Sequence, residues 1–260
     1  MRTVLICHEE ETLNRNLLPR WLASFSTLTG IVVLRESRQQ KQRRVQRELK
    51  RVGWLRFMDV LAFRLYYAAF LSAKDRRWEA STLSRLSERY RSIPASTLTI
   101  VDSSANAPEV RDFILRSEPD IVVARCKQLL KEEVFAIPRD GTFVMHPGIC
   151  PEYRNAHGCF WAFANHDLER VGMTLLRIDR GVDTGAIFGY FHCDYDEREE
   201  SHIVIQNRTV FDNLDAIAKR LIEIHEGRAI SLDVNGRKSA AWGQPWLTSY
   251  LRWRKAAALR

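Results

Sequence analysis

The chain has 260 residues, of which 45% are hydrophobic, and it carries a formal net charge of +8. This is the composition of an ordinary globular protein, long enough to bury the core of one large domain or of a domain with an appendage. The excess of positive charge favours anionic partners in general, such as a phosphate-bearing substrate, RNA or a membrane surface.

The five cysteines are an odd number, are widely spread, and lie mostly inside apolar runs. This distribution favours reduced thiols and therefore a cytoplasmic protein. No signal peptide is evident, because Met1-Arg2 leads directly into a short run typical of a strand. Cys150 and Cys159 flank His157, but no CxxC pair or second half-site accompanies them, so we expect no metal.

The first elements predict a βαβ unit. Residues 3–7 form an apolar run typical of a buried parallel strand, residues 13–25 have the spacing of an amphipathic helix, and residues 31–34 predict a second strand. The turn after the first strand, residues 8–11, lacks the glycines of a GxGxxG fingerprint. A nicotinamide or flavin site is therefore not expected there.

A basic segment and then an apolar one follow the second strand. Between residues 35 and 56, nine Lys or Arg meet two Glu, which indicates a mostly helical, solvated basic surface. Residues 57–71 are very apolar but include two charged residues, so they are too short and too charged to span a bilayer. We interpret them as a helix packed on the core. The alternative is an interfacial helix in which Trp54 and the basic flank contact anionic lipid or an acidic substrate.

Two further strands lead to a candidate catalytic histidine. Residues 97–101 predict a third strand, and residues 121–124 predict a fourth. Residues 143–145 are β-prone and end at His146, because Pro147 lacks the N–H that a strand needs to continue. Ligands in open α/β sheets collect outside the carboxyl ends of the strands, so this is where a catalytic imidazole would be useful.

A candidate catalytic carboxylate, Asp183, follows His146 within forty residues of the sequence. An apolar, aromatic cluster at residues 159–163 predicts a helix, and residues 173–178 predict a strand. Asp183 follows on a tight loop between Gly181 and Gly185, and such glycines let the backbone approach a ligand closely.

In chain order these residues form the pattern His146-Pro147-Gly148, Pro151-x-Tyr153-Arg154, Trp161-Ala162, Val171-Gly172-Met173-Thr174 and Asp179-x-Gly181-x-Asp183-Thr184-Gly185. The pattern resembles the formyltransferases that use 10-formyltetrahydrofolate, including the glycinamide ribonucleotide, methionyl-tRNA and nucleotide-sugar enzymes. The resemblance covers residues 95–190 and, more loosely, the amino-terminal strand. It implies a Rossmann-like α/β fold with a mostly parallel sheet.

The catalytic set of that family is an Asn two residues before the His, the His itself, and the Asp of the Asp-Thr-Gly loop. His146 and Asp183 match this set, whereas Val144 stands in the place of the Asn. Val cannot hydrogen-bond, and losing one oxyanion donor typically costs roughly a hundredfold to a thousandfold in rate. The candidate substitutes are Asn155, His157, Arg125 and a backbone N–H near Gly148.

The resemblance also implies where the substrates bind. By position, the pterin of the folate would contact Cys126, Leu129, Gly181 and Val182, with plain packing as the alternative for Leu129 and Val182. Arg125 stands at a strand end beside His146 and is a candidate to bind a substrate anion, with an exposed ion pair as the alternative. Asn155 and His157 are the other candidate contacts to the acceptor.

The carboxyl-terminal part reads as an appendage. A helical period runs through residues 203–224 and closes at Gly227. The tail mixes Trp and Tyr with Lys and Arg, which can bind nucleic acid, but we favour a packed terminal segment. We therefore expect a formyltransferase-like domain at residues 1–200, with a basic helical insertion at residues 35–94, and a helix and tail at residues 201–260 packed on it.

Together these observations predict transfer of a formyl group from 10-formyltetrahydrofolate to a primary amine of a small anionic molecule, without a metal. A nucleotide-linked amino sugar is the first guess for the acceptor. Nucleic acid is not the expected partner, because the methionyl-tRNA members carry a further β-barrel domain for which the tail leaves little room. Three alternatives stay open: a formyltetrahydrofolate hydrolase, a non-catalytic folate-binding or regulatory protein, and an RNA- or membrane-associating protein. Homodimer formation and peripheral membrane contact also stay open.

Overall fold

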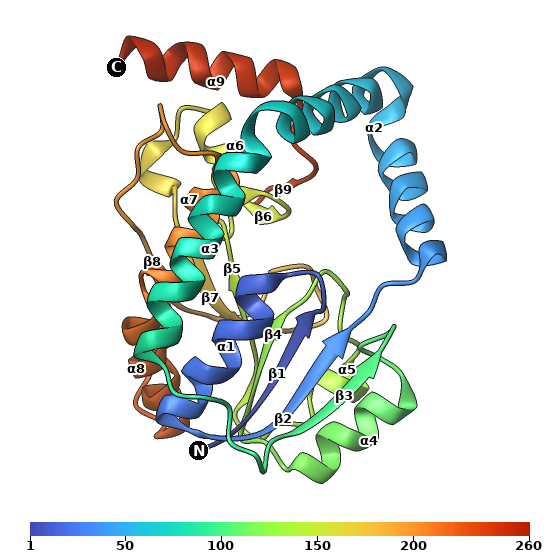
Figure 1. The fold of residues 1–260 in the computed structure, drawn as a ribbon, viewed down its shortest axis with the longest axis vertical. Helices are drawn as coiled ribbons and strands as arrows, with labels where there is room; N and C mark the ends of the chain where they lie inside the picture. Colours follow the sequence, from blue (N-terminus) through green and yellow to red (C-terminus); the bar gives the residue numbers. More distant parts are fainter.

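A seven-stranded sheet organises the computed structural model, which describes residues 1–260. Its strands are β1 (Arg2–His8), β2 (Thr27–Leu34), β3 (Leu98–Asp102), β4 (Ile121–Arg125), β5 (Gly141–His146), β7 (Met173–Arg177) and β8 (Ile187–Phe191). Their order across the sheet is β3-β2-β1-β4-β5-β7-β8 (Figure 1). The pairs from β3 to β5 are parallel, and β7 and β8 are antiparallel. The predicted mostly parallel α/β fold is confirmed.

The central strands are apolar because both of their faces are covered. Leu5 and Cys7 of β1 pack into one cluster with α1 (Thr12–Phe25) and α8 (Leu214–His225). Val4 and Ile6 pack into a second cluster on the other face with α4 (Pro108–Ser117). The alternation along the strand places its successive side chains on opposite faces of the sheet, so helices cover both.

The segment 35–94, which we predict to be an insertion, is helical: it contains α2 (Arg38–Tyr66) and α3 (Ser72–Arg89), joined by a π-helical turn, η1 (Tyr67–Leu71). A capping box starts α2: the Ser37 hydroxyl accepts from the N–H of Gln40, whose side chain accepts from the N–H of Ser37. Gly53, with φ of 75°, kinks α2 into two halves. The first half stands at the side of the molecule, and the second crosses the top next to α9 (Leu247–Leu259) (Figure 1).

One predicted helix is wrong in its extent. The segment 203–224 is two helices, α7 (His202–Phe211) and α8, because the side-chain amide of Asn213 donates to the carbonyls of His192 and Thr209 and fixes a break. β8 is a strand that the sequence pattern did not predict. The remaining elements are α5 (Glu132–Phe135), β6 (Arg154–Asn155), α6 (Gly158–Ala164), η2 (Leu168–Arg170) and β9 (Ala241–Trp242). No helix is long and apolar enough to cross a bilayer.

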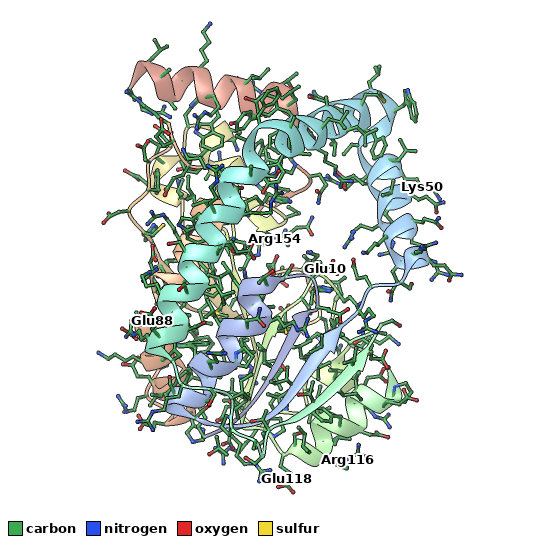
Figure 2. The ribbon with its side chains drawn as sticks, viewed as in Figure 1. Glu10, Lys50, Glu88, Arg116, Glu118 and Arg154 are labelled. Carbon is green, nitrogen blue, oxygen red and sulfur yellow. The ribbon has the colours of Figure 1, made fainter.

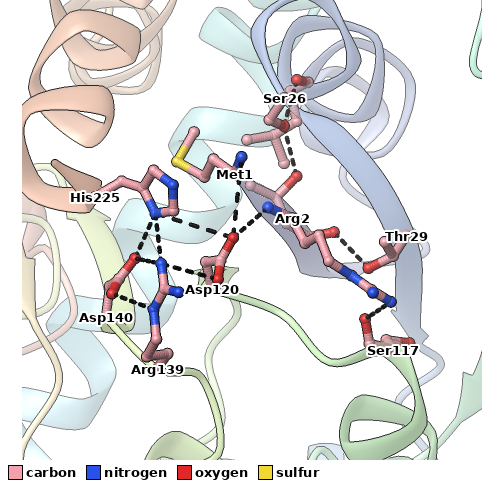
Figure 3. Close-up of polar contacts among 11 residues, drawn as sticks. Met1, Arg2, Ser26, Thr29, Ser117, Asp120, Arg139, Asp140 and His225 are labelled. Carbon is pink, nitrogen blue, oxygen red and sulfur yellow. Dashed lines mark hydrogen bonds and ion pairs between the residues drawn. The ribbon is translucent and has the colours of Figure 1, made fainter.

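An ion-pair cluster lies where β4 and β5 begin (Figure 3). Nδ1 of His225 lies 2.7 Å from a carboxylate oxygen of Asp140, and Arg139 lies 3.1 Å from both Asp120 and Asp140. The amino group of Met1 is 4.0 Å from Asp120. Asp120, Asp140 and His225 have the spacing of metal ligands, but Arg139 and the amino group already supply positive charge to the carboxylates. We interpret the cluster as a structural contact that stabilises the amino ends of the strands, at the edge of the sheet opposite the one where β5 ends at His146.

Candidate active site

His146 and Asp183 meet at the carboxyl end of β5. Nδ1 of His146 lies 3.4 Å from Oδ2 of Asp183, and the two side chains are 5% and 15% exposed. On the other side of the ring, Nε2 lies 2.8 Å from the carbonyl oxygen of Tyr153. Both ring nitrogens therefore face oxygen acceptors. A carbonyl oxygen can only accept, so Nε2 is the nitrogen that donates to Tyr153, and Nδ1 is the nitrogen that lies beside the carboxylate.

The loop after β7 is folded so that Asp183 points at His146. Oδ1 of Asp179 accepts from the N–H of Gly181 at 2.9 Å and from the hydroxyl of Thr184 at 2.7 Å, which closes a tight turn. A side chain at Gly185 would clash with the backbone of β7. Asp183 itself has φ of 52°, a left-handed conformation that Asp tolerates better than most residues. The predicted loop thus has a geometric reason for its glycines.

The segment between β5 and α6 also fixes the position of the Asp183 loop. The backbone N–H of Asn155 donates to Oδ2 of Asp183 at 2.7 Å, and Nη1 of Arg154 donates to the carbonyl of Val182 at 2.8 Å. Arg154 lies near the middle of the molecule (Figure 2). β6, which consists of these two residues, pairs in parallel with β9. The tail from residue 241 onward is therefore hydrogen-bonded to the segment that orients Asp183.

Gly148 lets the chain fold back onto His146. A Cβ atom at this position would lie 2.5 Å from the carbonyl oxygen of Tyr153 and 2.9 Å from Nε2 of His146. Any side chain here would push apart the two groups that form the hydrogen bond. The Pro147-Gly148 turn therefore does more than end a strand, because it brings the Tyr153 carbonyl to the imidazole.

The aromatic residues of the tail pack beneath this segment. The ring of Trp242 stacks on Tyr153 and on Trp161, with centroids 5.8 Å and 4.9 Å apart. Nε1 of Trp161 donates to the carbonyl of Gly243 at 2.9 Å. Trp253 is fully buried. The tail thus uses its aromatic side chains for packing, and it supports the floor of the candidate site.

Val144 lies on the same face of β5 as His146, two residues away. It packs against a small apolar cluster of Cys150, Leu176 and Ile187. Its side chain provides no hydrogen-bonding group beside His146, as the sequence analysis expected from the residue type.

Most of the candidate substitutes for the missing Asn already have partners. The side-chain amide of Asn155 donates to the carbonyl of Trp242, and the N–H of Gly148 donates to the carbonyl of His146. Arg125 donates through Nη1 to the carbonyl of Met145 and through Nε to Asn14, which leaves Nη2 without a protein partner. His157 also has a nitrogen without a hydrogen-bond partner, its buried Nδ1.

His157 lines a pocket of about 250 Å³ between α2, the start of α7 and the segment before α9. His202, also in this pocket, is buried, and its Nδ1 likewise has no hydrogen-bond partner. Burial lowers the pKa of His157 to about 4 and holds the pKa of His202 well below its usual value, so both rings are neutral at pH 7. The other lining residues are Val60, Phe63, Arg64, Tyr67, Ile203, Gln244 and Pro245.

This pocket combines two neutral imidazoles with aromatic walls and one cation. Each neutral imidazole offers one donor and one acceptor, which suits a ligand rich in hydroxyl or amide groups. Arg64 is exposed and hydrogen-bonds only to Gln244, at 3.4 Å. The guanidinium is therefore free to bind an anionic group.

The residues expected to hold a pterin lie on both sides of His146. Leu129 follows β4, whereas Gly181 and Val182 follow β7, and these two strands flank β5 in the sheet. Leu129 is 67% exposed, so it is not packed in the core. Val182 is half-buried and its carbonyl accepts from Arg154.

The last of these expected pterin contacts, Cys126, is half-buried. Burial raises the pKa of its thiol to about 12, so the sulfur stays neutral. A neutral thiol suits an apolar contact with a ring better than it suits nucleophilic chemistry, because the thiolate is the reactive form.

Sequence reasoning missed three contributors: the Tyr153 carbonyl, His202 and Arg64. The position of Arg64 inside an apolar run was a signal that this segment contains a functional polar residue. No sequence signal marked His202 or the carbonyl, because both become relevant only through packing.

Comparisons with known proteins identify the family and the fold. A family model described as "Formyl transferase" matches residues 71–221, which is more than half of the chain. A methionyl-tRNA formyltransferase of Caldanaerobacter subterraneus is 27% identical over 130 residues, covering 50% of this chain and 41% of the relative. The chain thus matches less than half the length of that curated relative.

Two solved structures share the fold. A sugar N-formyltransferase from a Shewanella species has a TM-score of 0.55 at 15% identity, covering 93% of this chain and 77% of that one. A phosphoribosylglycinamide formyltransferase from Anaplasma phagocytophilum has a TM-score of 0.55 at 11% identity, covering 94% and 99%. The chain belongs to the formyl transferase family.

Proposed function

We propose that the protein transfers a formyl group from 10-formyltetrahydrofolate to a primary amine of a small anionic molecule. The observation that carries the proposal is the 3.4 Å approach of Nδ1 of His146 to Oδ2 of Asp183, because the two residues come from separate motifs. A nucleotide-linked amino sugar or a similar cell-envelope precursor is the acceptor class to test first. A sugar N-formyltransferase is among the proteins with a similar fold, which supports that choice.

The side chains have complementary tasks in this reaction. The amine nitrogen attacks the formyl carbon, a new C–N bond forms, and the bond between that carbon and the folate nitrogen breaks. The amine must lose a proton and the folate nitrogen must gain one. His146 keeps Nε2 on the Tyr153 carbonyl, and Nδ1, which lies 3.4 Å from Asp183, turns to donate to the formyl oxygen as negative charge develops there. Asp183 orients and charges His146, and it relays the proton that the amine loses, directly or through one water, to the folate nitrogen as the bond to that nitrogen breaks.

Folate supplies the formyl group when bound, and the residues around His146 fit it. Leu129 offers an exposed apolar contact on one side, and the backbone of Gly181 and Val182 offers polar groups on the other. Cys126 contributes a neutral sulfur beside Leu129. These residues would hold the pterin so that the formyl group reaches His146.

The acceptor fits the pocket that contains His157 and His202. Asn155, whose backbone N–H donates to Asp183, is two residues from His157, so one short segment links the pocket to the Asp183 carboxylate. Arg64 in the pocket and the free Nη2 of Arg125 are the cations for an acceptor anion. Arg125 serves the acceptor anion, so we propose His157, whose buried Nδ1 has no hydrogen-bond partner, as the donor that replaces the missing Asn.

The proposed site uses both parts of the predicted domain division. Residues 1–200 supply His146, Asp183 and the pterin contacts, and residues 201–260 supply His202, Gln244 and the Trp242 support. We therefore propose that residues 201–260 are an appendage that completes the site of the formyltransferase-like domain.

The test is incubation of the purified protein with 10-formyltetrahydrofolate and a panel of amines, including nucleotide-linked amino sugars. Mass spectrometry should show an amine that gains one formyl group while the folate loses it. Absence of any formylated amine, together with no binding of 5-formyltetrahydrofolate in calorimetry, would remove the folate assignment.

Two other functions are separated by the same assay. Formate release without any amine would indicate a hydrolase that uses water as the acceptor. Folate binding that survives His146→Ala, with no turnover in either protein, would indicate a binding or regulatory protein, for which Val144 is the observation in favour.

A further inference from the structure

The second half of α2 carries apolar side chains on the side that faces solvent. Trp54, Leu55, Met58 and Leu65 are 64%, 86%, 47% and 73% exposed. At 100° per residue these four positions lie within about 100° of the helix circumference, so they form one continuous face. We call these four residues the α2 stripe.

The charged residues of the same half-helix turn toward the protein instead. The guanidinium of Arg56 lies over the Trp246 ring, 4.3 Å from its centroid. Asp59 accepts from the N–H of Thr248 at 3.0 Å, and Arg64 contacts Gln244. Arg56 and Arg64 remain exposed, but the charged side chains of this half-helix lie beside the protein and outside the α2 stripe.

The opposite side of the half-helix is the packed one. Phe57, Val60 and Phe63 are buried against the body of the protein. The stripe therefore faces away from the core, and folding of this chain gives it no partner. Exposed apolar patches of this kind mark interaction surfaces in soluble domains.

The first half of α2, which we call the basic arm (residues 38–52), adjoins the stripe across the Gly53 kink. Its two ion pairs, Arg44 with Glu36 and Arg51 with Glu48, neutralise both nearby carboxylates. Lys50 lies on this half, at the side of the molecule (Figure 2). The cations that are exposed and have no ion-pair partner are Arg38, Lys41, Arg43, Arg47 and Lys50.

We infer that the basic arm and the α2 stripe dock the protein on the surface of an anionic lipid bilayer. The stripe side chains enter the boundary between headgroups and acyl chains, and the arm cations contact the lipid phosphates. A second copy of the chain fits this surface less well, because packing stripe on stripe would add another positively charged arm beside the first. The inference is independent of the proposed formyl transfer.

Flotation of the full-length protein with two kinds of vesicle tests the inference. One vesicle contains phosphatidylcholine alone, and the other contains phosphatidylcholine with phosphatidylglycerol. We expect binding to the anionic vesicles that weakens as salt rises, and at least tenfold weaker binding to the neutral ones. The double variant Leu55→Asn/Leu65→Asn and the triple variant Arg43→Gln/Arg47→Gln/Lys50→Gln should each lose at least tenfold in binding.

The matched control is Leu98→Asn/Ile230→Asn, which changes two exposed apolar residues outside α2 and should bind like the wild type. Thermal unfolding of all variants shows that they are folded. The inference is overturned if the wild type ignores anionic vesicles, or if the control loses as much binding as the stripe variant. It is also overturned if light scattering shows a dimer that the stripe substitutions dissociate, and the wild type binds no vesicles. The same holds if the basic arm binds RNA and the stripe variant binds vesicles as the wild type does.

Discussion

The backbone N–H of Asn155 donates to Oδ2 of Asp183 at 2.7 Å, and the same oxygen faces His146. The carboxylate is therefore held by a main-chain donor and not only by its own loop. Because Asn155 belongs to β6, which pairs with β9, the orientation of the candidate catalytic pair depends on the packing of the tail.

Arg154→Met should weaken folate binding. Its guanidinium donates to the carbonyl of Val182, next to Asp183, so the variant frees the loop that we propose holds the pterin. A hydrogen bond to a charged group contributes about 1.5–3 kcal/mol, which corresponds to a tenfold or greater rise in Kd for 5-formyltetrahydrofolate in calorimetry. The control is Arg180→Met, since Arg180 lies in the same loop but only pairs with exposed Glu132. An equal loss of folate affinity in both variants would show that the contact between Arg154 and Val182 has no specific role in folate binding.

Gly148→Ala should destabilise the protein and reduce its activity together. The added methyl group would lie 2.5 Å from the Tyr153 carbonyl and 2.9 Å from Nε2 of His146, so it separates two groups that hydrogen-bond. Overpacking of this kind costs about 1–3 kcal/mol in urea unfolding. Gly227→Ala is the comparison, because Gly227 has φ of 69° and open space around it, so only the backbone conformation is penalised, by about 1 kcal/mol. Normal activity in Gly148→Ala would contradict the proposed geometry of the ring.

His202→Phe should make the protein more stable and less sensitive to acid. Burial lowers the pKa of both His202 and His157, so the unfolded chain binds protons more readily than the folded one as the pH falls below about 6.5. The stability that the two neutral rings contribute is fully present above that pH, and it is lost as the pH falls toward about 4. Removing His202 takes away one of these groups and one buried unpartnered nitrogen, whose cost is roughly 1–3 kcal/mol.

Urea unfolding at pH 7, 6 and 5 measures this effect. The slope of stability against pH should be shallower in His202→Phe than in the wild type. His166→Gln, which changes an exposed histidine, should keep the wild-type slope. A variant with the wild-type slope would show that His202 does not contribute to the acid sensitivity.

His157→Phe should slow formyl transfer without removing folate binding. We propose that Nδ1 of His157 replaces the family Asn as an oxyanion donor, and loss of one such donor costs roughly a hundredfold to a thousandfold in kcat. His157→Gln retains a donor and should recover part of the rate. If His157→Phe raised only KM for the amine, the ring would serve acceptor binding alone.

The strands of the parallel sheet were predictable because burial on both faces leaves near-continuous apolar runs such as residues 3–7. The His146 and Asp183 positions were predictable from turn chemistry and family resemblance. The division between α7 and α8 was not, since it depends on the side chain of Asn213 bonding to His192, which is distant in sequence. The pocket with His157 and His202 could not be predicted from the sequence either, because it forms only when α2 folds back after the Gly53 kink.

The central claim is that His146 and Asp183 together carry formyl transfer, and the most direct measurement is the rate of folate-dependent amine formylation in three variants. His146→Gln and Asp183→Asn should each lower kcat by roughly a hundredfold to ten-thousandfold, with folate binding retained, whereas His166→Gln should match the wild type. Wild-type rates in His146→Gln or in Asp183→Asn would contradict the account.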